Sequence, residues 1–254
     1  MGSLKGKVAV VTGSGRGIGR GIAERLARDG ALVAVHYGSN EAAAEETAAA
    51  IAEDGGRAFI LGAQLGVPGD LDTFMTGLES GLHAHGESRI DILVHNAGLN
   101  LMGRPIEVLT PEEFDRMIAV NVKAPFFLTQ RLLPRLRDGG RIINISSVST
   151  RVASAHGIAY PLTKGALEVF SHTLAKYLGP RGITVNSVRV GFTRTDMTAD
   201  VLADPANMER NLSLTALGRI GEVPDIADAV ALLASDDARW ITGAEIDVTG
   251  GVNL

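Results

Sequence analysis

The sequence contains no cysteine, so disulfide bonds and thiolate zinc sites are excluded. Its six histidines show no H-E-x-x-H spacing, and we expect no metal site. No apolar segment approaches the roughly 20 residues that span a bilayer, and the apolar run near the N-terminus is too short for the core of a signal peptide. The absence of cysteine and of targeting signals suits a cytoplasmic protein.

A basic stripe is absent as well. The formal net charge is −5, so nucleic acid and anionic membranes are not expected partners. The chain has 254 residues, of which 45% are hydrophobic, which is enough for a sizeable core. No linker, repeat or low-complexity tract interrupts it, so we expect a single α/β domain over residues 1–254.

A strand, a glycine-rich turn and a helix follow one another near the N-terminus. Val8–Val11 is a continuous apolar run typical of a strand buried on both faces. Ile18, Ile22 and Leu26 then recur at helical spacing. Glycines in such a turn let backbone N–H groups approach a pyrophosphate, and the helix dipole favours its charge. The residues predicted to bind a dinucleotide here are Gly13, Ser14, Gly15, Arg16, Gly17, Ile18 and Gly19. The alternative is a tight turn that binds no ligand.

The second predicted strand, residues 31–35, is followed by a segment without an acidic residue. This segment contains Tyr37, Gly38, Ser39 and Asn40. A site for NAD usually has Asp or Glu here to accept from the ribose 2′-hydroxyl, and that carboxylate would repel a 2′-phosphate. We therefore expect NADP to be preferred, with NAD possible, and we expect Tyr37 to flank the adenine. The competing interpretation is that Ser39 or Asn40 only caps the helix predicted over residues 41–53.

The rest of the chain continues to alternate between strands and helices. Further strands are predicted over residues 57–61, 90–94, 141–145, 183–188 and 244–248. Helices are predicted over residues 68–83, 110–137 and 223–233, with one more around Tyr160. This alternation predicts a parallel sheet covered by helices on both faces.

Three further features point to a site at the carboxyl ends of the strands. Asn96, Ala97 and Gly98 end the fourth strand, and small residues there let a ligand lie against the backbone. Asn121 is unfavourable inside a helix, which suggests a specific role, although it could simply face solvent. Residues 191–217 are polar and weakly periodic, and we interpret them as a lid over the site. Pro125 should kink or interrupt the long helix around it.

Tyr160 and Lys164 lie four positions apart and therefore share one helix face. An ammonium group beside a phenol favours the phenolate, so we expect Lys164 to lower the pKa of Tyr160. Such a tyrosine could give a proton to a carbonyl oxygen or take one from an alcohol. The simpler interpretation is a packed tyrosine and a solvated lysine.

These residues together resemble the classical short-chain dehydrogenase/reductase family, and within it the ketoreductases similar to 3-oxoacyl-carrier-protein reductase. The resemblance covers essentially the whole chain. It rests on Gly13, Gly17, Gly19, His95–Gly98, Asn121, Ser147, Tyr160, Lys164, Asn186 and Gly191–Met197, all in family order.

The resemblance implies a single-domain Rossmann fold with a doubly wound, seven-stranded parallel sheet. It also implies a catalytic tetrad of Asn121, Ser147, Tyr160 and Lys164. Tyr160 would protonate the carbonyl and Ser147 would hydrogen-bond it. Lys164 would hold the nicotinamide ribose, and Asn121 a water in a proton relay. The remaining cofactor contacts would be Gln64, Leu65, Gly191, Thr193 and Thr195.

Three positions depart from the family pattern. His95 replaces the first Asn of N-N-A-G, and we expect little loss from it. Gln64 stands where an Asp usually contacts adenine, and it can still accept from the adenine amino group. Val190 replaces the Pro of a Pro-Gly pair, which frees the backbone beside the nicotinamide.

The leading functional hypothesis is an NADPH-dependent reductase acting on a small-molecule ketone. A 3-oxoacyl thioester would need a basic patch at the mouth, with Arg135, Arg137 and Arg181 as candidates. A polyketide or cyclic ketone would suit an apolar mouth. Its candidate lining residues are Leu99, Leu101, Met102, Phe192, Met197 and Met208. The alternatives are an NAD-linked alcohol or sugar dehydrogenase and a non-catalytic dinucleotide-binding regulator. The family resemblance also predicts a homotetramer.

Overall fold

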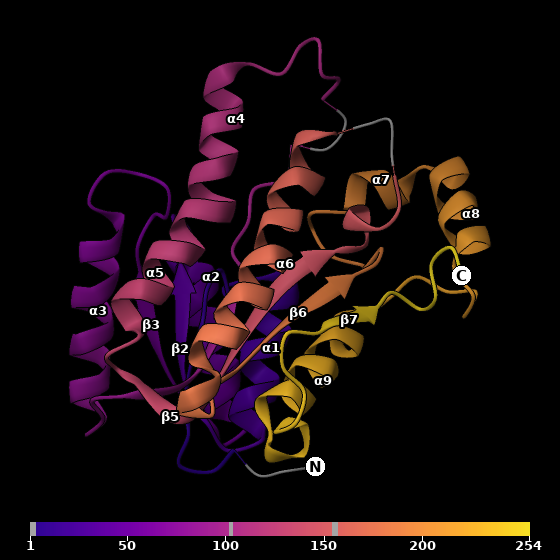
Figure 1. Cartoon of the computed structure of the whole chain (residues 1–254). Helices are drawn as coiled ribbons and strands as arrows, with labels where there is room; N and C mark the ends of the chain where they lie inside the picture. Colours follow the sequence, from indigo (N-terminus) through magenta and orange to yellow (C-terminus); the bar gives the residue numbers. More distant parts are fainter. Residues whose placement is uncertain (1–3, 102–103, 154–156) are drawn as a thin grey trace.

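The computed structural model describes residues 4–101, 104–153 and 157–254. Its strands form one seven-stranded sheet in the order β3-β2-β1-β4-β5-β6-β7, and every neighbouring pair is parallel (Figure 1). The strands are β1 (Val8–Val11), β2 (Leu32–Tyr37), β3 (Arg57–Gly62), β4 (Ile90–His95), β5 (Leu136–Ser147), β6 (Thr184–Val190) and β7 (Glu245–Val248). The predicted doubly wound Rossmann fold is confirmed.

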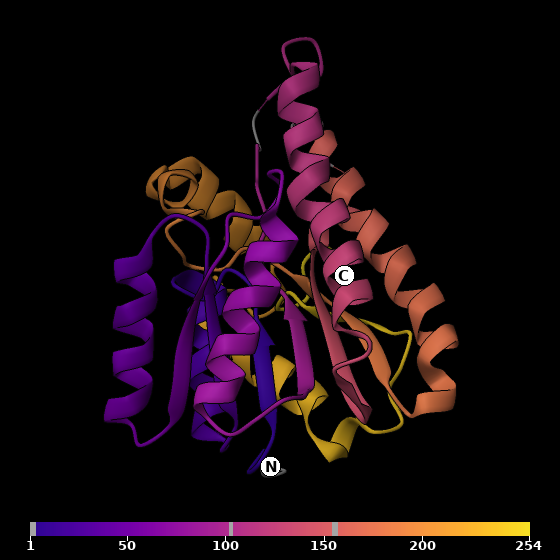
Figure 2. The ribbon, with the colours of Figure 1, turned by 90° about the vertical axis from the view of Figure 1, so that its left-hand side faces the viewer.

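Helices cover both faces of this sheet, as Figure 2 shows. They are α1 (Gly17–Arg28), α2 (Glu41–Glu53), α3 (Asp70–Ala84), α4 (Pro111–Ile118), α5 (Ala124–Leu132), α6 (Ala159–Leu178), α7 (Ala199–Ala203), α8 (Pro205–Leu214) and α9 (Val223–Ala234). Successive strand residues point to opposite faces, so Ala9 and Val11 pack with α1 and α9, whereas Val8 and Val10 pack with α3, α5 and α6. Both faces are buried, which is why the strands are continuous apolar runs.

The helix predicted over residues 110–137 is three segments and ends at Leu132. Thr110 and Glu113 form a capping box that begins α4. A π-helix, η1 (Ala119–Lys123), joins α4 to α5, and the amide of Ala124 donates to the carbonyl of Ala119. Pro125 follows at once, so the missing proline N–H falls where the ladder changes. The predicted local break at Pro125 is confirmed.

Strand β5 begins earlier than predicted. Gly139 and Gly140 lie inside it instead of breaking the chain before it. A Cβ atom on Gly140 would lie 2.8 Å from the carbonyl oxygens of both Arg137 and Asp91. Glycine is needed there because the backbone is crowded, and the register against β4 shifts between Ile90 and Ile92.

Residues 191–217 contain α7 and α8, which the sequence did not identify as helices. They lie above the sheet at the upper right of Figure 1, while α4 rises above the strands at the top. Among the described residues, no helix has the length and apolar character required to cross a membrane. No group of three or more metal-ligating side chains occurs in that same part of the chain.

Candidate active site

A cavity of about 1110 Å³ opens at the carboxyl ends of the strands. It is centred where the strand order reverses between β1 and β4, the usual ligand position in a doubly wound sheet. Its lining includes most of the residues predicted from the sequence: Gly13, Gly15, Arg16, Gly17, Ile18, Gly19, Tyr37, Gly38, Ser39, Asn40, Gln64, Leu65, Asn96, Ala97, Gly98, Ser147, Tyr160, Lys164, Gly191, Thr193 and Thr195. Ser14 and Asn121 are fully buried and lie behind the cavity wall.

The glycine-rich turn is held by close backbone contacts. Gly13 has φ +64°, and a Cβ atom on it would lie 3.0 Å from Ala97 Cα. A Cβ atom on Gly19 would overlap the carbonyl oxygen of Gly13 and the amide nitrogen of Asn96. That Asn96 Nδ2 donates to the carbonyls of Thr12 and Gly13, at 2.9 and 3.0 Å. The turn therefore accepts only glycine at its crossing point and is tied to the end of β4.

Ser14 and His36 tie the same turn to β2 from below. The Ser14 hydroxyl donates to the carbonyl of Val11 at 2.7 Å and accepts from the amide of His36 at 3.0 Å. The amide of Gly13 donates to His36 Nδ1 at 2.9 Å, and His36 Nε2 lies 2.8 Å from the carbonyl of Ala63. Nδ1 must be the acceptor and Nε2 the donor, so the imidazole is neutral. Burial lowers its pKa to about 4.

Sequence reasoning assigned no role to His36. A histidine in an otherwise apolar strand was the available signal. Its contacts to Gly13 and Ala63 join residues far apart in the chain, so only the fold could show them.

The N-terminus of α1 fits a pyrophosphate. Arg16 caps this helix without a side-chain hydrogen bond, and no acidic residue lies in the first turn. The first amides of α1 therefore lack helical or side-chain acceptors and face the cavity beside Gly17 and Ile18. Arg16 is exposed and has no carboxylate partner among the described residues.

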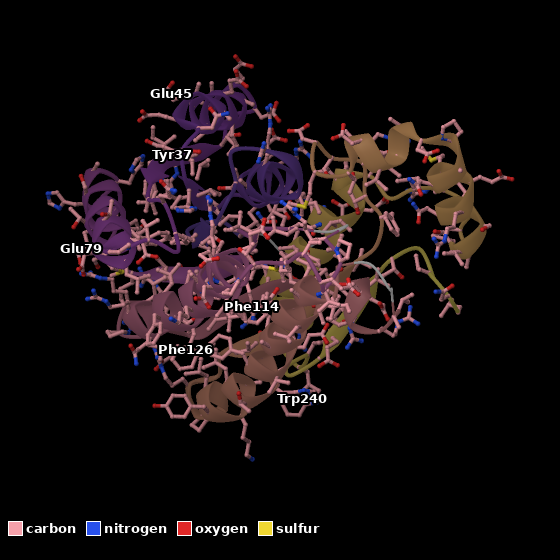
Figure 3. The ribbon with its side chains drawn as sticks, turned by 90° about the horizontal axis from the view of Figure 1, so that it is seen from above. Tyr37, Glu45, Glu79, Phe114, Phe126 and Trp240 are labelled. Carbon is pink, nitrogen blue, oxygen red and sulfur yellow. The ribbon has the colours of Figure 1, made fainter. Side chains whose placement is uncertain are left out.

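The segment that follows β2 suits the 2′-phosphate of NADP better than the free ribose 2′-hydroxyl of NAD. Asn40 Oδ1 accepts from the amide of Ala43, so Asn40 does cap α2. The nearest acidic side chain, Glu41, accepts from the Tyr37 hydroxyl at 2.6 Å and lies outside the described cavity lining. In Figure 3, Tyr37 lies beside α2, which carries Glu45, on the side of the molecule opposite Trp240.

Ser147, Tyr160 and Lys164 meet at the other end of the cavity. Tyr160 and Lys164 lie in the first turns of α6, which begins at Ala159, just before Pro161. A hydrogen bond links the side chains of Tyr160 and Ser147. Lys164 Nζ lies 5.6 Å from the centre of the Tyr160 ring and donates to the carbonyl of Ile145 at 2.8 Å.

The pKa of Tyr160 is raised and not lowered as the sequence predicted. Burial raises it to about 12, although the hydrogen bond to Ser147 acts in the other direction. Burial also lowers the pKa of Lys164 to about 8. Desolvation outweighs the attraction between the two groups because the lysine amine is directed at Ile145. Tyr160 is thus a protonated donor at neutral pH.

Asn121 has a specific role in the backbone behind the site and does not face solvent. Its Oδ1 accepts from the amide of Leu99 at 2.7 Å, and its Nδ2 donates to the carbonyl of Leu99 at 2.8 Å. Nδ2 also lies 3.0 Å from Thr163 Oγ1. Asn121 therefore joins the loop after β4 to the helix that carries Tyr160 and Lys164.

Below Ser147 lies a charged network that sequence reasoning missed. Glu168 Oε1 accepts from Ser146 Oγ at 2.8 Å and from Thr150 Oγ1 at 2.9 Å. Arg189 donates to both oxygens of Glu168, with Nε at 2.8 Å and Nη2 at 3.0 Å. Burial by itself would raise the pKa of Glu168, but the bonds from Arg189, Ser146 and Thr150 hold it below its ordinary value. The turn that carries Ser147 is thus fastened at both ends.

Val190, which replaces the Pro of the family's Pro-Gly pair, lies next to this network. Val190 continues β6 and pairs with Ser147 on one side and Val248 on the other. A proline would remove a donor and end the strand. Val190 instead extends the strand as far as the level of Ser147, directly after Arg189.

The substrate end of the cavity has only part of the predicted lining. Leu99, Phe192 and Met197 line it, whereas Leu101 and Met208 lie outside the described lining. Met102 is outside the described residues. Polar residues of α8 also contribute, among them Asn207 and Asn211.

The hypothesis that Arg135, Arg137 and Arg181 form a basic patch at the mouth of the site is wrong. Arg135 pairs with Glu79, Arg137 with Glu87, and Arg181 with Asp138. Arg135 and Arg137 flank the first residue of β5, at the end of the strand away from Ser147. The cavity lies at the opposite end of the sheet.

A family model described as enoyl-(acyl carrier protein) reductase matches residues 13–253. The chain belongs to the short-chain dehydrogenase/reductase family, as its motifs predicted. It is therefore an oxidoreductase.

Three of the proteins that this chain is similar to are reductases. The angucycline C-6 ketoreductase LanV with bound NADP is 54% identical, with a TM-score of 0.95, covering 100% of this chain and 98% of LanV. The promiscuous reductase LugOII, which catalyses keto-reduction at C1 during lugdunomycin biosynthesis, is 53% identical, with a TM-score of 0.94 and 99% of each chain covered. Tetrahydroxynaphthalene reductase of Pyricularia oryzae is 36% identical over 98% of this chain and 90% of its own length.

Proposed function

We propose that this protein is an NADPH-dependent ketoreductase that converts a ring or polyketide ketone into a secondary alcohol. The observation that carries the proposal is the meeting of Ser147, Tyr160 and Lys164 in the same cavity as the glycine-rich turn. A dinucleotide cradle and a proton donor are thereby joined in one space. The NADP-bound relative LanV supports the choice of reaction.

Each of the site residues has a separate role in the proposed ketone reduction. A reduced nicotinamide, when bound, supplies the hydride. Tyr160 donates its proton to the substrate oxygen as negative charge develops there, and Ser147 hydrogen-bonds the same oxygen. The ammonium of Lys164 stabilises the phenolate that is left. Asn121 holds the loop after β4 and the start of α6 in register.

NADPH is favoured over NADH by charge. The guanidinium of Arg16 has no carboxylate partner among the described residues, and no lining residue between 38 and 43 is acidic, which suits a 2′-phosphate. Ser39 and Asn40 add polar side chains there. Parallel assays with NADH test this choice, and tighter binding of NADH would instead favour the NAD-linked dehydrogenase.

A ring ketone is favoured over a carrier-protein thioester. Arg135 and Arg137, two candidates for contact with a carrier protein, lie at the far end of the sheet. The cavity, about 1110 Å³ including the cofactor space, is large for a single small ligand. LanV and tetrahydroxynaphthalene reductase are both named for action on ring systems.

The test of the reaction is Tyr160→Phe, measured as NADPH consumption against acetoacetyl thioester, simple cyclic, polycyclic aromatic and sugar ketones. Loss of the general acid should lower kcat about 10²- to 10⁴-fold. NADPH affinity should be retained, because the ring still packs. The exposed Tyr177→Phe is the matched control. Full reductase activity in Tyr160→Phe would refute the proton-donor assignment.

Two features of assembly and motion complete the proposal. Residues 191–217 act as a lid, since α7 and α8 contribute part of the cavity wall. The protein forms a homotetramer, supported by exposed apolar side chains such as Phe126 at 47% and Trp240 at 96% exposure. Figure 3 shows both at the outer edge of the molecule. Sedimentation as a monomer would rule out the tetramer.

A further inference from the structure

Among the residues that the structure describes, the side chain of Asn211 has no hydrogen-bond partner, although Asn211 is only 6% exposed. It lies on α8 and lines the cavity. No described residue makes a hydrogen bond with its side-chain amide. Nearby Asn207, one turn earlier, differs because its Nδ2 donates to Asp204 at 3.2 Å. Asn211 therefore offers one donor and one acceptor group to whatever occupies the cavity.

The backbone that carries Asn211 is fixed. Thr215 Oγ1 donates to the carbonyl of Asn211 at 2.7 Å, at the end of α8. Thr215 also bridges Val252, and the amide of Asn253 donates to the carbonyl of Leu214 at 2.9 Å. The end of α8 is thus fastened to the C-terminal segment. A fixed backbone with an unpaired amide is a preorganised recognition group.

Burial makes the side-chain amide of Asn211 costly unless water or a ligand in the cavity completes its hydrogen bonds. An apolar side chain of similar size would avoid that cost at the same place. Ser146 and Glu168, which are also buried, have protein partners instead.

We propose that Asn211 is a specificity-determining residue that hydrogen-bonds an oxygen substituent of the substrate remote from the reacting ketone. The inference rests on the proposed ketoreductase function and narrows its substrate class. The preferred substrates are ring ketones that carry a hydroxyl or a second carbonyl. Unsubstituted ring ketones react without this contact.

The experiment compares kcat/KM with NADPH for α-tetralone and for its phenolic derivatives hydroxylated on the ring remote from the ketone. One neutral hydrogen bond is worth about 0.5–1.5 kcal/mol, so the wild type should prefer at least one phenol about 3- to 10-fold. Asn211→Leu should reduce that ratio to about 1 while changing α-tetralone turnover by less than about 2-fold. The KM for NADPH should not change.

Two further variants test the hydrogen-bonding role of Asn211. Asn211→Asp retains an acceptor, so it should keep the preference for a hydroxyl substituent and lose it for the corresponding methoxy compound. Glu209→Leu places the same new side chain at an exposed position of α8 and should leave the ratio unchanged.

The outcomes separate the two proposals. Equal losses on α-tetralone and on its phenols in Asn211→Leu would overturn the assignment, because they would indicate packing. A wild type without any preference for a phenol would also overturn it. A wild type that reduces no ketone at all would overturn the ketoreductase function and this assignment together.

Discussion

The cofactor end of the cavity is built mainly from backbone, whereas the substrate end is built from side chains. Around Gly13 and Gly19 the wall is formed by amides and carbonyls, and a single added Cβ would overlap a neighbour. Around Ser147 the wall depends on Glu168, Arg189 and the helix that carries Asn211. A backbone wall fits one constant ligand, and a side-chain wall can change with the substrate.

Among the changes to the two walls themselves, the largest effect should come from the backbone wall. In Gly19→Ala the new Cβ meets the carbonyl of Gly13 and the amide of Asn96. Overpacking of this kind costs about 1–3 kcal/mol, so we expect up to about 100-fold weaker NADPH binding, measured by titration of the NADPH fluorescence. Gly179→Ala is the control, because no atom lies within 4 Å of its Cβ position. Unchanged NADPH affinity in Gly19→Ala would contradict the proposed difference between the cofactor end and the substrate end of the cavity.

A smaller effect should come from the side-chain wall. Glu168→Gln removes the charge that Arg189 faces and loosens the turn that carries Ser147. We expect kcat for ketone reduction to fall about 10-fold, while the KM for NADPH stays within about 2-fold. Glu24→Gln, from a half-buried ion pair with Arg20 on α1, is the control.

The informative result for Glu168→Gln is whether kcat falls while the KM for NADPH stays nearly constant. A parallel loss of NADPH affinity would mean that the network supports the whole cavity and not its substrate end. A thermal melt beside the kinetics shows how much of the loss is general destabilisation.

The smallest effect should be the pH dependence of Lys164. Burial lowers its pKa to about 8, so its ammonium is present below that pH and is lost above it. Reduction needs this charge beside the phenolate of Tyr160, so kcat/KM should fall as pH rises, reaching half its plateau near the lysine pKa. The raised pKa of Tyr160 keeps the proton donor intact over the same range. A profile of kcat/KM from neutral to alkaline pH measures this fall.

Lys164→Arg provides the test of that assignment. Arginine keeps its charge throughout the range, so the variant should be slower but should lose the alkaline fall. The same fall in Lys164→Arg would assign the titration to another group.

Sequence alone was sufficient for the parts of the protein that depend on local pattern. The apolar run Val8–Val11, the glycines after it and the helical spacing of Ile18, Ile22 and Leu26 predicted a strand, turn and helix, and the structure contains them. The break at Pro125 was predicted in the same way. These signals come from steric and hydrogen-bonding limits within a few residues.

Only the tertiary structure decided what depends on distant partners. The pKa of Tyr160 rises because the fold buries it and turns Lys164 toward Ile145. His36 acquires its role from Gly13 and Ala63. Glu168 and Arg189 meet across α6 and β6, and Asn211, which has no partner among the described residues, lines the cavity because α8 lies over it. Charge, burial and partnership are properties of packing, and no local pattern in the chain contains them.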